Sequence, residues 1–239
     1  MNILAIETTG AEASVAVINE REEVFMEASD QKLSHLQNLM PMVDILLKKR
    51  GLSIGDMDYI AVSEGPGSFT GIRIGVSSAR ALAQALGLQT IGVPTLKSFL
   101  YNAPDYKGVV CPIFDARRSQ VYGGAYRWTE EGRYEEVVPG AAYDLNELLS
   151  LLETTTGEIT FFGDGIASYE AQILKWQELS LKDNIRILFA EDDIKFQKAS
   201  SVARLALALY REGKVKSFND LKPVYMRQAE AERKLEGKA

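Results

Sequence analysis

Hydrophobic and polar positions along the chain separate short apolar runs from longer stretches with helical periodicity. Apolar runs of about four to eight residues predict strands, and apolar residues spaced three and four apart predict helices. The first half has strand patterns at 3–6, 14–18, 22–28, 59–63 and 90–93, and helix patterns at 34–49, 70–86 and 95–101. The second half has strand patterns at 109–114, 120–127, 134–138, 159–162 and 185–189, and helix patterns at 144–153, 166–178 and 198–212.

The two halves repeat one order of elements, β-β-β-α-β-α-β-α. Hairpin strands followed by alternating helices and strands, present twice, predict a two-lobed α/β protein. The interval 102–108 contains Pro104, Asp105 and Gly108, which indicate a hinge. We therefore expect an N-terminal lobe at 1–103, a C-terminal lobe at 104–218 and a C-terminal segment at 219–239 whose charged end frays.

Composition narrows the class of protein. The 239 residues are 46% hydrophobic, enough for a substantial core. The net charge of −6 disfavours unaided binding to nucleic acid phosphates. A single cysteine, Cys111, excludes an internal disulfide and fits a reducing compartment, and no segment is apolar for long enough to span a membrane. These features predict a cytoplasmic protein without a membrane partner.

Chemistry based on histidine or thiolate is poorly supported by the sequence. His35 is the one histidine, so a metal site with two histidines is excluded and a catalytic centre that relies on histidine is not expected. Cys111 lies in an apolar run, which predicts a buried and unreactive thiol. No histidine stands near an evident nucleophile, so a peptidase has no support. We expect neither a catalytic residue nor a metal ligand.

A glycine-rich turn joins the strand at 59–63 to the helix at 70–86. Its sequence, Gly65-Pro66-Gly67, leaves two interpretations open. Free backbone N–H groups at the start of a helix suit an anion, whereas a tight turn lets the helix begin close to the sheet. The turn lacks the Gly-Lys-Ser/Thr ending of a Walker A loop.

Two helices of the first lobe carry apolar or small residues outside their predicted core stripes. For the helix at 70–86 the core stripe is Ile72, Gly75, Val76, Ala79, Leu82, Ala83 and Leu86. For the helix at 34–49 it is Leu36, Leu39, Met40, Val43, Leu46 and Leu47, with Met42 and Ile45 outside it. Residues left over after the core is formed predict a protein-binding surface, although the second lobe could also cover them.

We assign ten residues of the two helices to this predicted partner-binding surface. Small side chains on the second helix, with Gly71 and Gly75 four residues apart, allow another helix to approach closely. The assigned residues are Leu39, Met42, Ile45, Gly71, Arg73, Ile74, Ser77, Ser78, Ala81 and Ala85.

Several motifs, in the same order over essentially the whole chain, resemble the TsaB (YeaZ) family. They are 4–10 (LAIETTG), 14–17 (SVAV), 64–73 (EGPGSFTGIR), 92–96 (GVPTL), 115–117 (DAR) and 223–227 (PVYMR). The resemblance implies a two-lobed actin-like/Hsp70-like fold (ASKHA, ribonuclease H-like). It also implies a role in forming N6-threonylcarbamoyladenosine at position 37 of tRNAs that read codons beginning with A.

The resemblance implies that the chain partners a related catalytic subunit, TsaD, alongside TsaE, while TsaC supplies the threonylcarbamoyl-adenylate. The resemblance implies that the helical surface pairs with the homologous helices of TsaD, and forms a homodimer when TsaD is absent. It implies contact with tRNA only through the complex. TsaD carries two metal-binding histidines in a motif whose positions here hold Thr95 and Phe99. The motif therefore predicts a non-catalytic subunit that needs no cofactor of its own.

Nucleotide binding is the remaining question. In the actin-like fold one hairpin from each lobe holds the phosphates, and the matching residues here are Thr8, Thr9 and Gly10, then Asp115 and Arg117, or Arg118 beside it. Because these residues could contact phosphates, ATP or ADP is a candidate ligand of the assembled complex. The alternative function is an ATP-dependent kinase or carbamoyltransferase of the same superfamily, with Asp115 as base or metal ligand.

Overall fold

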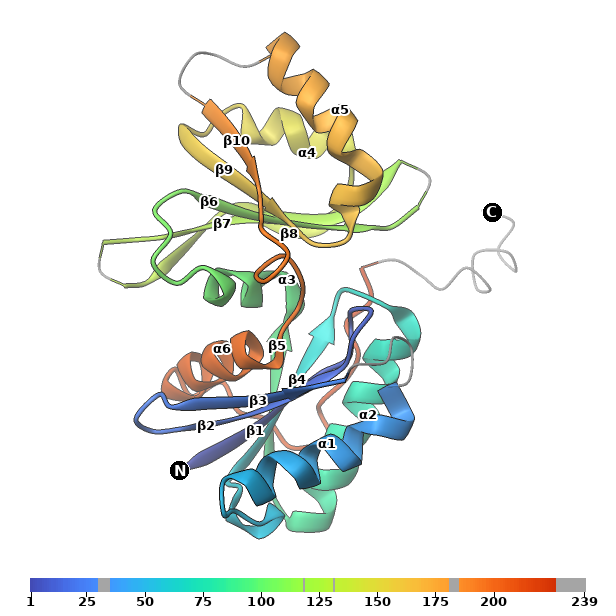
Figure 1. Ribbon diagram of the computed structural model, residues 1–239, viewed down its shortest axis with the longest axis vertical. Helices are drawn as coiled ribbons and strands as arrows, with labels where there is room; N and C mark the ends of the chain where they lie inside the picture. The colour runs from blue at the N-terminus through green and yellow to red at the C-terminus, as the bar shows by residue number, and fades with distance from the viewer. Residues whose placement is uncertain (30–34, 118, 131, 181–184, 227–239) are drawn as a thin grey trace.

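The computed structural model describes residues 1–29, 35–117, 119–130, 132–180 and 185–226, whose strands form two five-stranded sheets (Figure 1). The first sheet has the order β3-β2-β1-β4-β5. Its strands are β1 (Asn2–Glu7), β2 (Ser14–Asn19), β3 (Val24–Ala28), β4 (Tyr59–Gly65) and β5 (Gln89–Pro94). Strands β1, β4 and β5 are parallel, and β2 lies antiparallel between β1 and β3.

The second sheet repeats this arrangement. Its order is β8-β7-β6-β9-β10, with β6 parallel to β9 and antiparallel to β7. Its strands are β6 (Val109–Asp115), β7 (Gln120–Trp128), β8 (Tyr134–Asp144), β9 (Gly157–Phe162) and β10 (Ile185–Phe189). The repeated strand order confirms the predicted two-lobed actin-like fold.

Six α-helices and two short 3₁₀ helices accompany the strands within the described residues. They are α1 (His35–Lys49), η1 (Ile54–Asp56), α2 (Phe69–Leu86), α3 (Thr95–Ser98), η2 (Phe99–Asn102), α4 (Leu145–Leu152), α5 (Gly165–Ser180) and α6 (Ala199–Arg211). Ser34, the predicted first residue of the helix at 34–49, lies outside the described residues. Strand β8 is longer than its prediction because it pairs with β7 from Tyr134 to Asp144.

The first sheet is covered on both faces, which explains why β1 is apolar at every position from Ile3 to Ile6. Leu4 and Ile6 pack into a core with α1 and α2, and alternate residues Ile3 and Ala5 pack into a second core with α6. Because successive side chains of a strand point to opposite faces, a strand covered on both sides needs an unbroken apolar run. Helices α1 and α2 thus lie together on one face and α6 on the other (Figure 1).

Helix α6 shows that the predicted lobe boundaries are wrong. The boundary at 104–218 assigned this helix to the C-terminal lobe, but Val202, Leu205 and Ala206 are buried against the first sheet. Its amphipathic pattern is visible in the sequence, whereas the choice of sheet depends on contacts with residues near the opposite end of the chain.

The second sheet is also covered on both faces, on one of them by helices from the first half of the chain. Helices α4 and α5 pack on one of its faces with Cys111 and Ile113. The other face packs Val110 and Phe114 against Leu96 and Phe99 of α3 and η2. Each half therefore contributes its last helical segment to the sheet of the other half, and α3 and α6 lie between the two sheets (Figure 1).

The C-terminal segment, like α6, packs against the first lobe. Lys216 forms a two-way backbone bridge with Thr90 of β5, with N–O distances of 2.8 and 2.9 Å. Leu221 is buried in the first core, and the Val224 N–H donates to the Glu64 carbonyl at 2.7 Å. The part of the segment up to residue 226 is therefore packed, whereas residues 227–239, including the predicted frayed end, lie outside the described residues.

Candidate partner-binding face and phosphate turns

The outer surface of α1 and α2 contains most of the predicted partner-binding residues. Ile45, Arg73, Ser77, Ala81 and Ala85 are exposed, and Ile74 and Ser78 are partly buried. Three of the exposed residues, Ser77, Ala81 and Ala85, are four residues apart along α2 and carry no charge. We call the exposed side chains of Met40, Ile45, Ser77, Ala81 and Ala85 the α1–α2 flank.

On α1 the structure corrects the predicted stripe. Leu39 and Met42, which we assigned to the partner-binding surface, are 1% and 6% exposed and lie in the core of the first lobe. Met40, which we assigned to the core, is 47% exposed. The core-facing side of α1 is a stripe through Leu39, Met42, Val43, Leu46 and Leu47, so four residues of the predicted stripe are confirmed and Met42 takes the place of Met40.

On α2 the two glycines serve a contact inside the lobe. A Cβ added at Gly71 would lie 1.9 Å from the Thr8 carbonyl oxygen, and one at Gly75 would lie 2.4 Å from the Thr8 Oγ1. Both glycines are buried. The close approach that their spacing allows is therefore with the turn after β1, and the assignment of Gly71 to a partner surface is wrong.

The same tight packing explains the glycine-rich turn before α2. A Cβ at Gly67 would lie 2.6 Å from the Cβ of Thr9, and the Ser68 N–H donates to the Thr9 carbonyl at 2.8 Å. Ser68 then caps α2 by accepting from the Gly71 N–H at 3.2 Å. The turn lets the helix begin against the end of β1, as its tight-turn interpretation predicts.

Arg73 already has contacts within the chain. Its guanidinium lies 3.9 Å from the centroid of the Phe69 ring, and its Nε donates to the Tyr225 hydroxyl at 2.9 Å. The Phe69 and Tyr225 rings are 4.8 Å apart. This cluster holds the C-terminal segment beside the start of α2, a contact that spans 152 residues in sequence and that no local pattern could predict.

The hydroxyls of the first phosphate turn point inward. Thr8 is fully buried and donates from its Oγ1 to the Gly71 carbonyl at 2.7 Å. Thr9 is also buried and donates to the Glu7 carboxylate from its hydroxyl at 2.6 Å and its N–H at 2.5 Å. Our assignment of these two hydroxyls to phosphate is therefore corrected, because both hold the turn together. Gly10 lies close to Gln197.

The second turn is stabilised by the Asp115 carboxylate. It accepts from the Arg117 N–H at 2.7 Å and from the hydroxyls of Tyr169 and Ser168 on α5 at 3.1 and 3.3 Å. Arg117 and Ser119 have φ values of 61° and 60°, in the region that glycine prefers. Asp115 and Arg117 are exposed, so a role of these two residues in binding nucleotide stays a prediction, while Arg118 lies outside the described residues.

Glu7 is a buried carboxylate that our sequence reasoning did not single out. It accepts hydrogen bonds from the Ser63 hydroxyl of β4 and from Thr9. Burial raises the pKa of the Glu7 carboxyl, and the hydrogen bonds from Ser63 and Thr9 only partly oppose this effect. An acidic residue at the end of an apolar strand, followed by two hydroxyl residues, was the one available signal.

Replacing Glu7 with glutamine is expected to change how stability depends on pH. The pKa of Glu7 lies above 4.5 in the folded protein. At pH values between 4.5 and this higher pKa, Glu7 therefore keeps its proton in the folded protein and has lost it in the unfolded chain. The free energy of unfolding of the wild type should therefore decrease as pH rises from about 4.5 towards neutral. Glu7→Gln cannot ionise, so it should lose this part of the decrease in chemical denaturation curves. Glu12→Gln, an exposed change in the same turn, should retain it, and identical curves for Glu7→Gln and wild type would contradict this account.

The positions that the resemblance matched to metal-binding histidines are buried. Thr95 and Phe99 are inaccessible, and the Thr95 Oγ1 has no hydrogen-bond partner among the described residues. Cys111 is also buried, which raises the pKa of its thiol and makes the thiolate unfavourable. Within the described ranges there is no group of three or more His, Cys, Asp or Glu residues that could hold a metal ion, and none of the described helices is long and apolar enough to cross a membrane.

Comparisons with known proteins match the whole length of the chain. Residues 28–235 match the family model described as TsaD: tRNA N6-adenosine threonylcarbamoyltransferase. The chain is 32% identical over 234 residues to the tRNA threonylcarbamoyladenosine biosynthesis protein TsaB of Bacillus subtilis, covering 98% of this chain and 97% of the relative. It is 30% identical to the protein of the same name in Escherichia coli, covering 100% of both.

Solved structures agree on the fold. YeaZ from Pseudomonas aeruginosa superposes with a TM-score of 0.72 at 24% identity, covering 94% of this chain and 99% of that one. Component A of the (R)-2-hydroxyglutaryl-CoA dehydratase of Acidaminococcus fermentans superposes with a TM-score of 0.50 at 8% identity, covering 89% and 98%. The two-lobed architecture is thus shared well beyond recognisable sequence similarity.

Proposed function

We propose, since this chain belongs to the TsaB family, that it takes part in the biosynthesis of N6-threonylcarbamoyladenosine in tRNA. In this proposal the chain is a non-catalytic subunit that holds a TsaD-type catalytic subunit in its active arrangement. TsaE joins the same complex, and tRNA is reached through the complex because a net charge of −6 disfavours direct binding to phosphates. We place the complex in the cytoplasm.

The non-catalytic role rests on what the interior contains. Thr95 and Phe99, at the positions matched to metal-binding histidines, are buried side chains without metal-binding capacity in this setting. The rival function, an ATP-dependent kinase or carbamoyltransferase, needs phosphate donors in the first turn. There Thr8 and Thr9 already donate to groups of the protein itself, so the described residues of this turn do not favour the rival. ATP or ADP is expected to bind only in the assembled complex.

The α1–α2 flank carries the partner-binding part of the proposal. Ser77, Ala81 and Ala85 form an uncharged, small-residue line on the exposed side of α2, and Met40 and Ile45 expose apolar side chains on α1. Small residues let a partner helix approach closely, and exposed apolar ones supply area to bury. The match of residues 28–235 to a TsaD family model supports a partner with homologous helices. The same flank is proposed to form the homodimer when TsaD is absent.

The test is an arginine placed in the middle of the flank. Ala81→Arg should leave the chain folded, because the position is exposed and surface changes away from special features have small effects on stability. It should weaken binding to the TsaD-type subunit by at least about 100-fold, because a charge buried without a partner at an interface is costly. Co-purification and titration calorimetry with that subunit provide the measurement.

A matched control places the same arginine on the other lobe. Ala171 is exposed on α5, far along the chain from the flank, and Ala171→Arg should bind the TsaD-type subunit like the wild type. If Ala81→Arg also forms the complex with wild-type affinity, the flank is not the binding surface.

A further inference from the structure

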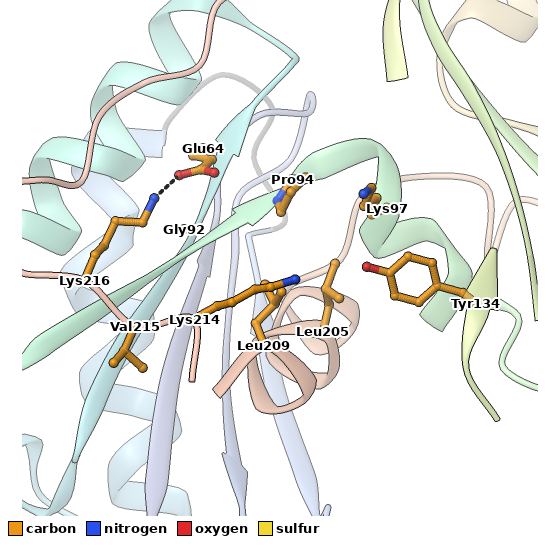
Figure 2. A pocket seen from close by; sticks show the side chains of 10 residues that line it. All are labelled: Glu64, Gly92, Pro94, Lys97, Tyr134, Leu205, Leu209, Lys214, Val215 and Lys216. Atoms are coloured by element: carbon orange, nitrogen blue, oxygen red, sulfur yellow. Dashed lines mark hydrogen bonds and ion pairs between the residues drawn. The ribbon is translucent and has the colours of Figure 1, made fainter. Parts of the chain in front are cut away.

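A hollow of about 330 Å³ lies beside α6 at the carboxyl ends of β4 and β5 (Figure 2). We call it the lysine hollow because three of its side chains are lysines. It is lined by Glu64, Gly92, Pro94, Lys97, Tyr134, Leu205, Leu209, Lys214, Val215 and Lys216. These residues come from both halves of the chain, and none belongs to the α1–α2 flank.

The backbone holds one side of the hollow in place. Lys216 is fixed by its bridge to Thr90, and its ammonium group contacts the Glu64 carboxylate at 2.9 Å. This ion pair crosses β5 at Gly92, where an added Cβ would lie 1.9 Å from the Glu64 Oε2 and 2.7 Å from the Lys216 Nζ. A glycine in the strand is therefore required for the pair to lie against the sheet.

The other two lysines have carboxylate partners that do not line the hollow. Lys97 contacts Glu136 at 2.7 Å and Lys214 contacts Glu212 at 2.6 Å. An ammonium group has three donors, and each of these lysines uses one on its carboxylate. Hydrogen bonding to Glu212 raises the pKa of Lys214, which favours the ammonium form of its side chain.

Figure 2 shows how these groups are arranged around the hollow. Lys214 extends over Leu209 towards Leu205, and the Tyr134 hydroxyl points into the hollow from the opposite side, below Lys97. The lining therefore combines three positive charges, one negative charge and a floor of Leu205, Leu209 and Val215.

We propose that the lysine hollow is a binding site for a small organic anion with a carboxylate or phosphate-monoester head and a short apolar body. The head accepts hydrogen bonds from Lys97, Lys214 and Tyr134, and the body packs on Leu205 and Leu209. A volume of about 330 Å³ lies at the lower end of the roughly 300–1,000 Å³ range of small-molecule pockets, which suits a compact ligand. The carboxyl ends of parallel strands are also where open α/β sheets bind ligands.

Titration calorimetry at constant ionic strength tests this site, with pentanoate and propyl phosphate as separate probes. Saturable binding of at least one probe is expected, and comparing the two identifies the preferred head group. Pentanamide, which has the shape of pentanoate without its charge, should bind at least about tenfold more weakly. Absence of saturable binding for both anions, or equal binding of pentanamide, would overturn the proposal.

Two variants with opposite expected effects separate the site from non-specific charge effects. Lys214→Gln should weaken binding of the preferred probe at least about tenfold, whereas Glu212→Gln frees Lys214 and should strengthen it by about two- to fivefold. Lys175→Gln and Glu170→Gln make the same charge changes on exposed positions of α5 and should leave the affinity unchanged. If Lys214→Gln binds like the wild type, or Glu212→Gln does not bind more tightly, the proposed geometry is wrong.

Discussion

Replacing Gly71 with alanine is expected to destabilise the protein by about 3 kcal/mol or more, as judged from the upper range for forcing extra atoms into a packed interior. The added Cβ would lie 1.9 Å from the Thr8 carbonyl oxygen, which is backbone and cannot rotate away. Either α2 moves off the end of β1, or the turn that holds Thr8 and Thr9 is distorted. Urea denaturation of the purified chain measures the loss.

The control for this prediction is an alanine at a glycine with space around it. At Gly55 in η1 the nearest atom to an added Cβ is the Ser53 Oγ at 3.7 Å, an ordinary contact distance. Gly55→Ala should therefore change the free energy of unfolding by less than about 1 kcal/mol. A Gly71→Ala variant as stable as Gly55→Ala would show that α2 does not pack against the turn as described.

Phe99→Ala is expected to cost about 3–5 kcal/mol, the range for removing a large aromatic side chain from a core. Phe99 is fully buried in η2, and its ring centroid is 5.6 Å from that of Phe114 and 6.0 Å from that of Phe162. Both partners belong to the second sheet, whereas Phe99 comes from the first half of the chain. The change therefore tests whether the exchanged segment stabilises the opposite lobe.

Thermal unfolding followed by circular dichroism and by tryptophan fluorescence provides the measurement, because Trp128 lies on β7 of the second sheet. Leu151→Ala is the control, since this α4 side chain is 41% exposed and its loss should cost less than about 1 kcal/mol. If Phe99→Ala unfolds at the wild-type midpoint in both signals, η2 does not contribute to the second core.

Family membership and the repeated order of elements could be predicted because both depend on local patterns. The glycine-rich run at 64–73 and the apolar strand at 109–114 can be recognised from the sequence without knowing which residues they contact in the fold. Composition alone excluded a metal site with two histidines, because the chain has one histidine. The apolar run around Cys111 likewise predicted a buried and unreactive thiol. The exposure of the small residues Ala81 and Ala85 on α2 could also be predicted, because this helix has a clear core stripe.

Several site assignments were wrong because the sequence allows a side chain two different surroundings and does not decide between them. Met40 and Met42 are equally apolar, and only the sheet beneath α1 decides which one is buried. Thr8 and Thr9 carry hydroxyls that suit a phosphate, but the carbonyl of Gly71 and the carboxylate of Glu7 take their hydrogen bonds. The lysine hollow is assembled from β4, β5, α3, β8, α6 and residues 214–216, so no sequence window contains it.

The positions of strands and helices, and the repeat that they form, follow from periodicity, because alternation and helical spacing are imposed by backbone geometry within a few residues. Only the tertiary structure shows that α6 returns to the first sheet and that α3 and η2 cover the second. An amphipathic helix can bury its apolar side against any complementary sheet, so its location is decided by shape and by contacts between residues far apart in the chain.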